Sequence, residues 1–478
     1  MARITMKFGG TSVGSAQAIS RAVDIVCAAY ADGHQVLVVS SAMSGVTDML
    51  IEGARTAAAG DAARYQVIGG LLRDKHETAI RTLITSDVER ISVLDEVDGL
   101  IDEFEKLCYG IYVLRDATPK AMAKASSLGE RMCVPIFSAV LRQCGVPSTT
   151  VSASYLIVTD DQYDNAGVYF EETEALVREK LLPMVAGRIV PVVTGFIGAT
   201  RDGVITTLGR SGSDYSAALL GAYVDSDEVW IWTDVDGVMT ADPRVVPDAR
   251  VIPVLSYGEV GEMAYFGAKV LHAKTVQPLV ERNIPIWVKN TFNPSFPGTL
   301  ITNREETAPG TVKAVTAIRD VSLVTVAGRG MIGVPGIAAR TFSAVAAQKA
   351  SVLMISQSSS EQSICFVVPE STSERVVSAI RAEMANELSR RDIERVWAND
   401  NIEIIAVVGA GMLTQSGVAA RVFGALGDAN INILAIAQGA SDYCVSMVVD
   451  ASSTEEAVRQ IHKLVVLNGD NKTRADRP

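Results

Sequence analysis

Short runs of apolar, largely β-branched residues alternate with longer amphipathic segments through residues 4–302. Several of the short runs are apolar at consecutive positions, which is typical of strands covered by helices on both faces. This alternation predicts an α/β fold with a doubly wound, mainly parallel sheet. The predicted strands are residues 4–8, 35–39, 189–194, 204–207, 228–233 and 284–289, and the predicted helical segments are 16–31, 47–59, a polar run over 65–107, and 214–223.

The remainder of the chain repeats itself at a constant offset of 81 residues. Gly336-x-Ala-Ala-Arg-x-Phe recurs as Gly417-x-Ala-Ala-Arg-x-Phe, and the motif Leu-x-Ile-x-Gln ends at Gln357 and again at Gln438. A match that needs no gap indicates two copies of one structural unit. Each copy is predicted to run strand, helix, strand, strand, helix, and a further strand, 393–398, follows the first copy.

The second copy ends in a polar tail without a final strand, whereas an additional strand, 311–318, precedes the first copy. We expect this strand to complete the sheet of the second module, so that the two modules interlock. The polar Pro-Gly segment ahead of it is typical of a linker. The expected plan is an α/β domain over 1–302, a linker over 303–310, a first module over 319–400, a second module from 311–318 plus 401–467, and a tail over 468–478.

Composition disfavours several functional classes. The 478 residues carry 43 Lys plus Arg against 55 Asp plus Glu, a net charge of −12, whereas a general nucleic-acid binder needs a basic face. Prolines and Arg188 interrupt the most apolar stretch, and residues 1–10 hold no signal-peptide core. Six scattered cysteines and four separated histidines predict free thiols and no zinc site. We therefore expect a cytoplasmic protein with no membrane or nucleic-acid partner.

Residues 7–12 (Lys-Phe-Gly-Gly-Thr-Ser) follow the first predicted strand and precede a helix. The two glycines, Gly9 and Gly10, would let backbone N–H groups converge on an anion, and Lys7 can reach the same space. The pair of glycines alone would fit an ordinary tight turn. The combination with lysine and hydroxyl residues at a strand end favours phosphate binding.

Two further segments allow two interpretations each. Ser40 to Thr47 supplies hydroxyl groups after a strand, which suits an anionic ligand, but for this segment alone simple capping of the next helix by Ser44 or Thr47 is the better explanation. Glu130 lies at a predicted helix start, where it either favours the helix dipole or binds a substrate ammonium.

The segment 206–215 again joins a strand to a helix and is dense in Gly, Ser and Thr. Arg210 could hold a carboxylate in a bidentate fork, and Asp214 could orient Arg210 or Lys7. A capped helix start with an exposed arginine is the alternative. The density of small residues around both charges favours a binding site.

The last candidate segment, 232–244, contains several acidic residues, but it lacks the later Glu of an EF-hand. A loop that contacts nucleotide is the alternative, with Arg244 near phosphates. Lys269 is another candidate phosphate ligand, although a solvated helix lysine would look the same.

In this order, these motifs resemble the amino-acid kinase superfamily, and specifically the aspartate kinases (aspartokinases). The resemblance covers nearly the whole chain, and the C-terminal repeats look like a tandem pair of ACT domains. Two departures stand out: Ser211 replaces the first glycine of the usual Arg-Gly-Gly-Ser-Asp, and Ala-Lys replaces Pro-Arg after His272. The motifs that carry the resemblance are residues 7–12, 208–214 (Leu-Gly-Arg-Ser-Gly-Ser-Asp), 232–238 (Trp-Thr-Asp-Val-Asp-Gly-Val), 242–244 (Asp-Pro-Arg) and 267–272 (Gly-Ala-Lys-Val-Leu-His).

The resemblance implies an enzyme that transfers the γ-phosphoryl group of ATP, with Mg²⁺ held mainly by the nucleotide phosphates, to the side-chain carboxylate of L-aspartate. A carboxylate is already a nucleophile near neutral pH, which would explain why the motifs offer lysines and glycines but no histidine base. The resemblance assigns Lys7 and Asp214 to catalysis; Thr47, Glu130, Arg210 and Ser213 to aspartate; and Lys7, Gly9, Gly10, Ser40, Thr233, Asp234, Arg244 and Lys269 to ATP.

ACT domains imply feedback regulation by an end product of lysine, threonine or methionine biosynthesis, and a homodimer or homotetramer formed through these modules. Leu353 and Met354 occupy the middle of the strand where an acidic group would suit lysine, which favours threonine. The alternatives are a non-catalytic amino-acid sensor and another amino-acid kinase, and the length predicts no fused homoserine dehydrogenase. The expected effector contacts are Met331, Gly336, Val352, Gln357, Glu361 and Gln438.

Overall fold

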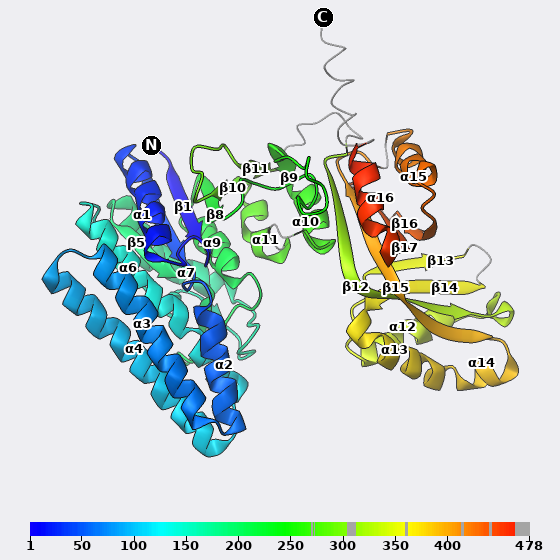
Figure 1. Ribbon diagram of the computed structural model, residues 1–478, viewed down its shortest axis with the longest axis horizontal. Coiled ribbons are helices and arrows are strands. Elements are labelled where there is room, and N and C mark those ends of the chain that lie inside the picture. The colour runs from blue at the N-terminus through cyan, green and yellow to red at the C-terminus, as the bar shows by residue number, and fades with distance from the viewer. Residues whose placement is uncertain are drawn as a thin grey trace, which may run out of the picture. The chain divides into compact units, whose positions relative to one another are not determined.

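The computed structural model describes residues 1–268, 271, 273–303, 312–358, 362–412, 415–438 and 442–463. The chain divides into two compact units (Figure 1). The first unit comprises residues 1–238, 253–257 and 271–304, and the second comprises 239–252, 258–270 and 305–478. One domain was predicted over residues 1–302. Two short segments of that region, residues 239–252 and 258–270, belong to the second unit instead.

A mainly parallel sheet forms the centre of the first unit. Among the described residues it has eight strands in the order β3-β5-β2-β1-β8-β10-β11-β9, and only the β10–β11 pair is antiparallel. This confirms the predicted doubly wound α/β class. The strands are β1 (Arg3–Phe8), β2 (Gln35–Ser40), β3 (Ser148–Val151), β5 (Val190–Thr194), β8 (Glu228–Thr233), β9 (Val254–Ser256), β10 (Ile286–Asn290) and β11 (Thr299–Thr302).

Strand β1 lies in the middle of this sheet and is buried on both faces. Met6 and Phe8 point into the main hydrophobic core, whereas the alternate residue Thr5 faces helix α9, where a Cβ on Gly221 would lie 3.2 Å from its hydroxyl oxygen. The core cluster also takes side chains from several helices. The helices of this unit are α1 (Ala16–Ala31), α2 (Val46–Ala59), α3 (Ala62–Leu83), α4 (Asp87–Leu114), α5 (Pro119–Ser126), α6 (Leu128–Gln143), α7 (Phe170–Lys180), α8 (Leu182–Ala186), α9 (Gly212–Tyr223) and α11 (Ala273–Glu281).

The polar run predicted over 65–107 is two helices, α3 and α4, rather than one. The break falls at residues 84–86, where Ser86 caps α4 by accepting a hydrogen bond from the N–H of Glu89. The predicted strand 204–207 also differs in its placement. It forms β7 (Ile205–Thr207), which pairs with β6 (Ile197–Thr200) in a separate small sheet with β4 (Val158–Thr159) rather than joining the main sheet.

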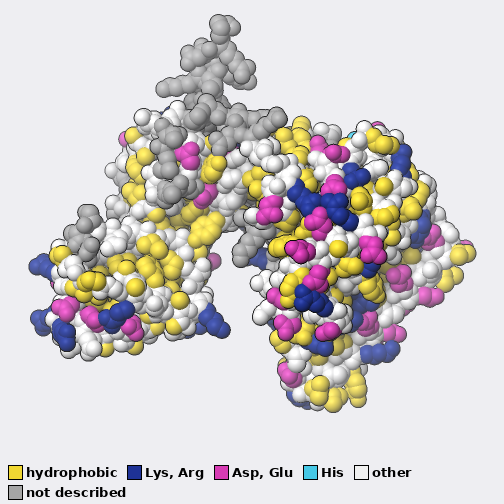
Figure 2. Space-filling view, turned by 180° about the vertical axis from the view of Figure 1, so that it is seen from behind, with side chains coloured by type: hydrophobic (Ala, Val, Ile, Leu, Met, Phe, Trp, Pro, Cys, Tyr) yellow, Lys and Arg dark blue, Asp and Glu magenta, His cyan; other side chains and the backbone are white. Residues whose placement is uncertain are grey.

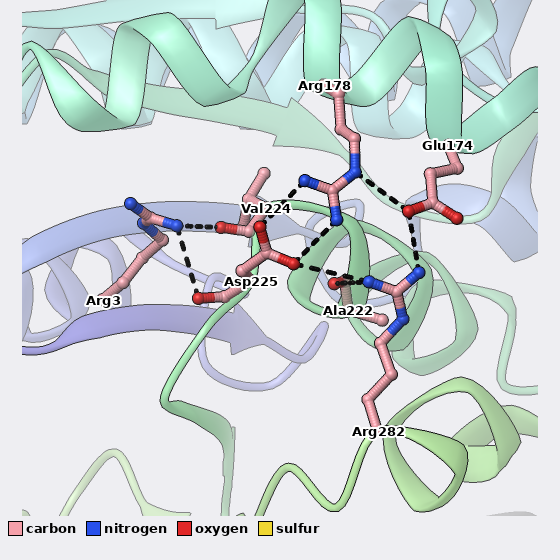
Figure 3. A network of polar contacts seen from close by, with 7 residues as sticks. All are labelled: Arg3, Glu174, Arg178, Ala222, Val224, Asp225 and Arg282. Carbon is pink, nitrogen blue, oxygen red and sulfur yellow. Dashed lines mark hydrogen bonds and ion pairs between the residues drawn. The ribbon is translucent and has the colours of Figure 1, made fainter.

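A network of charged side chains ties α7 to the chain segments that follow α9 and α11 (Figure 3). Arg178 of α7 donates two hydrogen bonds to the carboxylate of Asp225, at 2.8 and 2.9 Å, and a third to Glu174 at 2.9 Å. Arg282 contacts the same two acids, and Arg3 of β1 reaches the backbone carbonyl of Asp225. The hydrogen bond from Arg178 is the main cause that lowers the pKa of Asp225, and the charges of Arg178, Arg282 and Arg3 lower it further.

The second unit is built on an antiparallel sheet. Over its described residues, six strands run in the order β13-β14-β12-β15-β17-β16. Its elements are α10 (Tyr257–Tyr265, of which Tyr257 belongs to the first unit), β12 (Ala314–Ala327), α12 (Ile337–Ala347), β13 (Met354–Gln357), β14 (Ser363–Pro369), α13 (Glu370–Glu383), α14 (Ala385–Arg390), β15 (Arg395–Val408), α15 (Val418–Asp428), β16 (Ile433–Ala437), β17 (Cys444–Asp450) and α16 (Thr454–Ile461).

The two modules share their central strands. The first half of β12, from Ala314 to Ile318, pairs with residues 404–408 of β15 in the second repeat, and its second half pairs with β14 and residues 395–399 of the first. This register confirms that the strand ahead of the first repeat joins the sheet of the second. The prediction that strand 311–318 is separate from the first strand of the first repeat was wrong, because β12 passes through a bulge at Arg319 and Asp320 without ending.

The repeat predicted from sequence is evident in the elements. Helices α12 and α15 start 81 residues apart, each after a glycine with a positive φ, Gly336 at 93° and Gly417 at 86°. Strands β14 and β17 begin at the same offset, at Ser363 and Cys444. No helix in the described part of the chain is both long and apolar enough to cross a membrane.

Candidate active site

A cavity of about 510 Å³ opens in the first unit, where β1, β2 and β8 end and α2 and α9 begin. Parallel strands end at the same edge of a sheet, so the loops after them converge there. The cavity is lined from three loops, within residues 7–11, 41–48 and 209–214, and by Glu130, Phe196 and Thr233. The four motifs predicted around Lys7, Thr47, Glu130 and Asp214 therefore meet in one place.

An ion pair between Lys7 and Asp214 lies in this cavity. The Nζ of Lys7, near the end of β1, lies 2.6 Å from Oδ1 of Asp214 in the first turn of α9. The side chains are 11% and 15% exposed. Of the two partners that the sequence left open for Asp214, the structure pairs it with Lys7. A largely buried pair of this kind holds its ammonium in one position, because removing either charge leaves the other uncompensated.

The glycines after Lys7 serve close packing more than anion binding. The N–H of Gly9 donates to the carbonyl of Trp232 at 3.1 Å, so the expectation that it points at a phosphate was wrong. A Cβ on Gly10 would lie 3.3 Å from the carbonyl oxygen of Ala42, and one on Gly14 would lie 3.0 Å from the Ser44 side chain. These contacts let the first loop lie directly against the loop that follows β2.

The loop after β2 leads into α2 without a side-chain cap. Helix α2 begins at Val46, and its N-cap residue is Gly45 with φ of 78° and no capping side chain. Capping by Ser44 or Thr47 is therefore not the reason for the hydroxyl residues here. Thr47, Ser41 and Ser44 instead line the cavity.

Glu130 in the first turn of α6 is 3% exposed and lines the cavity. Its Oε1 accepts a hydrogen bond from the N–H of Ala42 at 3.1 Å, and its Oε2 has no hydrogen-bond partner in the described residues. Burial raises the pKa of Glu130 to about 8, against the hydrogen bond from Ala42 and the charge of Lys7, which lower it. Such a carboxylate is placed to accept a cationic group of a ligand.

The start of α9 has an unusual backbone. Ser211, its N-cap residue, has φ of 57°, in the left-handed region that glycine occupies more readily, and makes no capping hydrogen bond. Ser213 lines the cavity together with Gly212. Arg210 is exposed and is not among the residues that line the cavity, and no ion pair of its side chain occurs among the described residues.

Only some of the residues assigned to ATP by resemblance line the cavity. Thr233, at the end of β8, lines the cavity and donates to the exposed Asp234 at 3.2 Å. Ser40 is fully buried, does not line the cavity, and donates to the carbonyl of Ser41. Arg244 belongs to the second unit, where it pairs with Asp242 and stays 81% exposed. Lys269 lies outside the described residues.

Phe196 lines the cavity although no motif in the sequence pointed to it. Its φ is 67°, although it is not glycine, and its N–H donates to the hydroxyl of Ser216 at 3.0 Å. A Cβ on Gly212 would lie 2.8 Å from its ring, so the glycine makes room for the aromatic side chain. Met43 and Asp48 also line the cavity and were not predicted.

The structure offers few ligands of its own for a metal ion. In the residues that it describes, no group of three or more His, Cys, Asp or Glu side chains could hold one. A divalent cation at this cavity would need oxygen ligands from a bound phosphate.

Of the predicted effector contacts, only Gln357 and Gln438 lie at equivalent places in the two repeats, 81 residues apart. Met331 is buried and Gly336 precedes α12, while Val352 and Gln357 flank or end β13. Gln438 follows β16 and donates to the carbonyl of Met412 at 3.5 Å. Glu361 lies outside the described residues.

Comparison with known proteins identifies this arrangement. The Amino acid kinase family matches residues 2–290, and the ACT domain family matches residues 324–384 and 405–464. The fold and the family matches thus define an α/β unit of the amino acid kinase type that is followed by two ACT domains. The chain belongs to the amino acid kinase family, among the aspartokinases that carry two ACT domains.

Named relatives cover nearly the whole chain. It is 38% identical over 97% of its length to bifunctional aspartokinase/homoserine dehydrogenase 1 of Arabidopsis thaliana, of which it spans 51%; the chain covers about half the length of the curated relatives that head the comparison. It is 31% identical to the crystal structure of E. coli aspartokinase III in complex with aspartate and ADP, with a TM-score of 0.79 over 97% of this chain and 99% of that one. The chain is 30% identical to the structure of the same enzyme in complex with lysine and aspartate, with a TM-score of 0.76.

Proposed function

We propose that the protein is an aspartate kinase that transfers the γ-phosphoryl group of MgATP to the side-chain carboxylate of L-aspartate, giving 4-phospho-L-aspartate. The observation that carries this proposal is the Lys7–Asp214 pair, 2.6 Å apart in a cavity that also contains the buried Glu130. The likeness to an aspartokinase solved with aspartate and ADP supports it. The relatives carry the same activity in their names.

The chemistry needs positioning and charge neutralisation more than acid–base catalysis. The aspartate side chain attacks as a carboxylate, so no proton has to be removed from the nucleophile. Lys7 neutralises negative charge that shifts onto the transferring group and its neighbours, and Asp214 holds the Lys7 ammonium in place. Mg²⁺ would add further neutralisation while bound mainly to the nucleotide phosphates.

Substrate recognition divides between the two charged ends of aspartate. Glu130, with one carboxylate oxygen unpartnered, binds the α-ammonium, and the exposed Arg210 turns in to bind the α-carboxylate. Thr47 and Ser213 line the cavity between these positions and donate hydroxyl hydrogen bonds. The nucleotide lies along Gly10, Thr233 and Asp234, with Gly9 supporting the loop through its bond to Trp232. Ser40 is buried next to this loop and would support it from within the protein.

An ADP-release assay with aspartate against glutamate as acceptor tests the activity, with hydroxylamine added to trap the acyl phosphate. Aspartate-dependent ADP release with a trapped hydroxamate is expected. Turnover with glutamate alone would favour another amino-acid kinase. The absence of turnover in a protein that still binds aspartate would favour the rival function, a non-catalytic amino-acid sensor. A sensor would not explain the Lys7–Asp214 ion pair.

The ACT modules make the enzyme subject to feedback by an amino acid that derives from its product, as in the lysine, threonine and methionine pathways. E. coli aspartokinase III has been solved with lysine. Leu353 and Met354 do not occupy the middle of a strand as expected, since β13 begins at Met354, but neither offers the acid that would suit lysine, which favours threonine as the effector. Isothermal titration of threonine and lysine into the protein distinguishes the two, and binding of lysine alone would reverse the assignment.

The second unit also has the surface expected of an oligomer. Edge strands β13 and β16 leave Ile355, Leu434 and Ile436 exposed by 51%, 42% and 42%. Hydrophobic side chains gather over part of this unit in Figure 2. Pairing of ACT modules into a homodimer or homotetramer would cover such side chains. Sedimentation velocity of the protein and of Ile355→Lys tests this, because a charge in a buried interface should shift the protein toward monomer.

A further inference from the structure

Helix α10 comes from the α/β part of the sequence, yet it packs within the second unit. Its first residue, Tyr257, belongs to the first unit and donates its hydroxyl hydrogen bond to the carbonyl of Ile284, just ahead of β10. From Gly258 onward the helix belongs to the second unit, and the chain returns to the first unit at Leu271. One continuous helix therefore begins in one unit and ends in the other.

Close contacts fix the body of α10 to the ACT modules. Glu259 and Lys313, whose side chains are 0% and 5% exposed, form an ion pair at 2.8 Å immediately ahead of β12. A Cβ on Gly258 would lie 2.4 Å from the ring of Tyr443, which precedes β17. A glycine that another group approaches this closely allows no larger side chain without displacement. The helix is thus held against the second repeat and the shared strand.

The end of α10 contacts the first repeat through a single hydroxyl group. Tyr265, the last residue of the helix, donates to the carbonyl oxygens of Leu353 at 3.1 Å and Val352 at 3.4 Å. These two residues directly precede β13, and the N–H of Leu353 donates to Val367 of β14. The Tyr265 ring packs edge-on against Phe266 at 5.1 Å between centroids, which limits where its hydroxyl can point.

We propose that Tyr265 is a positioning residue that couples effector binding to catalysis, by tying the end of α10 to the backbone at Val352 and Leu353. This inference rests on the proposed function, because residues 352–357 are the expected effector contacts. An amino acid bound there competes for or moves these carbonyl groups, and the tyrosine hydroxyl follows them. The helix carries the change toward Tyr257, its first residue, whose hydroxyl group contacts Ile284.

The Tyr265→Phe variant removes the hydroxyl alone and keeps the ring packing. The full-length protein is titrated with threonine and with lysine, each with and without saturating aspartate, and the ratio of the two dissociation constants gives the coupling between sites. Loss of one neutral hydrogen bond should reduce this coupling about fivefold. Effector affinity without aspartate and the turnover number without effector should stay within about twofold of the unmodified protein. Tyr109→Phe, at a 61% exposed tyrosine of α4, is the matched control.

Two outcomes would overturn the inference. Unchanged coupling in Tyr265→Phe would mean that the hydroxyl transmits nothing, and an equal loss in Tyr109→Phe would mean that the effect is not specific. Hydrogen exchange of the α10 amides supplies a readout independent of turnover: effector should alter their protection in the unmodified protein and much less in Tyr265→Phe. If neither amino acid binds the unmodified protein, the coupling is rejected, while the hydroxamate assay separately decides whether the protein is an aspartate kinase.

Discussion

The Nζ of Lys7 lies 2.6 Å from Oδ1 of Asp214, so a lysine near the end of the first strand and an aspartate more than 200 residues later form one largely buried ion pair. The pair joins β1 to the first turn of α9 across the candidate cavity. The acidic partner holds the ammonium where a transferring phosphoryl group would need it. Neither residue could be assigned this partner with certainty from its own motif.

Removing either member of the pair should abolish most of the activity. We expect Lys7→Ala and Asp214→Asn each to lower kcat/KM by about two to three orders of magnitude, because each leaves a buried charge uncompensated and misplaces the other. The hydroxamate assay measures the loss, and circular dichroism checks the fold. Arg64→Ala, which breaks an exposed pair with Glu52, is the control and should leave activity unchanged. Near-normal turnover in Lys7→Ala would remove Lys7 from the phosphate site.

The raised pKa of Glu130 predicts how aspartate binding depends on pH. Only the ionised carboxylate attracts an ammonium group, and with a pKa of about 8 the free protein holds Glu130 largely protonated at pH 7. The KM for aspartate should therefore fall about tenfold per unit as the pH rises from 6 toward 8, and then level off. Glu130→Gln cannot ionise, so its KM should be high and nearly independent of pH. If Glu130→Gln keeps the same dependence of KM on pH, another ionisable group causes that dependence.

The sequence predicted which loops form the site, because the ends of parallel strands lie at the same edge of a sheet. It could not predict the bond from Gly9 to Trp232, since that partner is fixed by the pairing of β1 with β8. Phe196 carried no signal, because its positive φ is imposed by neighbours such as Ser216. The expected strand end at residue 318 was wrong because the polar Arg319 and Asp320 interrupt the apolar pattern, whereas the pairing of β12 with β15 continues past them.

The buried His76 should make the first unit sensitive to mild acid. Its Nδ1 donates to the carbonyl of Leu72 at 2.7 Å, its Nε2 has no partner among the described residues, and burial lowers its pKa to about 4. The folded state therefore resists protonation that the unfolded chain accepts near pH 6.5. The stability that neutral His76 contributes is therefore present above pH 6.5 and is lost as the pH falls from about 6.5 to 4. About 2 kcal/mol of this stability is lost by pH 5.

Urea unfolding followed by tryptophan fluorescence measures this effect, since Trp230, Trp232 and Trp287 all lie in the first unit. His76→Met should lose less stability between pH 7.5 and 5 than the unmodified protein, by about the same 2 kcal/mol. An equal acid sensitivity in His76→Met would show that other groups dominate.

The charged network around Asp225 should stabilise the first unit in a way that salt weakens. Asp225→Asn keeps a side chain that tolerates φ of 55° but removes the charge that Arg178 and Arg282 share. Because the Asp225 side chain is 50% exposed, solvent screens the interaction, and we expect a loss of about 1 kcal/mol at low ionic strength.

Thermal unfolding of Asp225→Asn at about 0.05 and 0.5 M NaCl tests this, since the Debye length falls several-fold in that range. The difference in Tm from the unmodified protein should shrink markedly at the higher salt. Glu52→Gln, in the isolated exposed pair with Arg64, should change Tm little at either concentration. If the Tm difference of Asp225→Asn does not depend on salt, the stabilisation comes from hydrogen-bond geometry and not from the charges. Salt screens the attraction between charges but leaves the hydrogen-bond geometry largely intact.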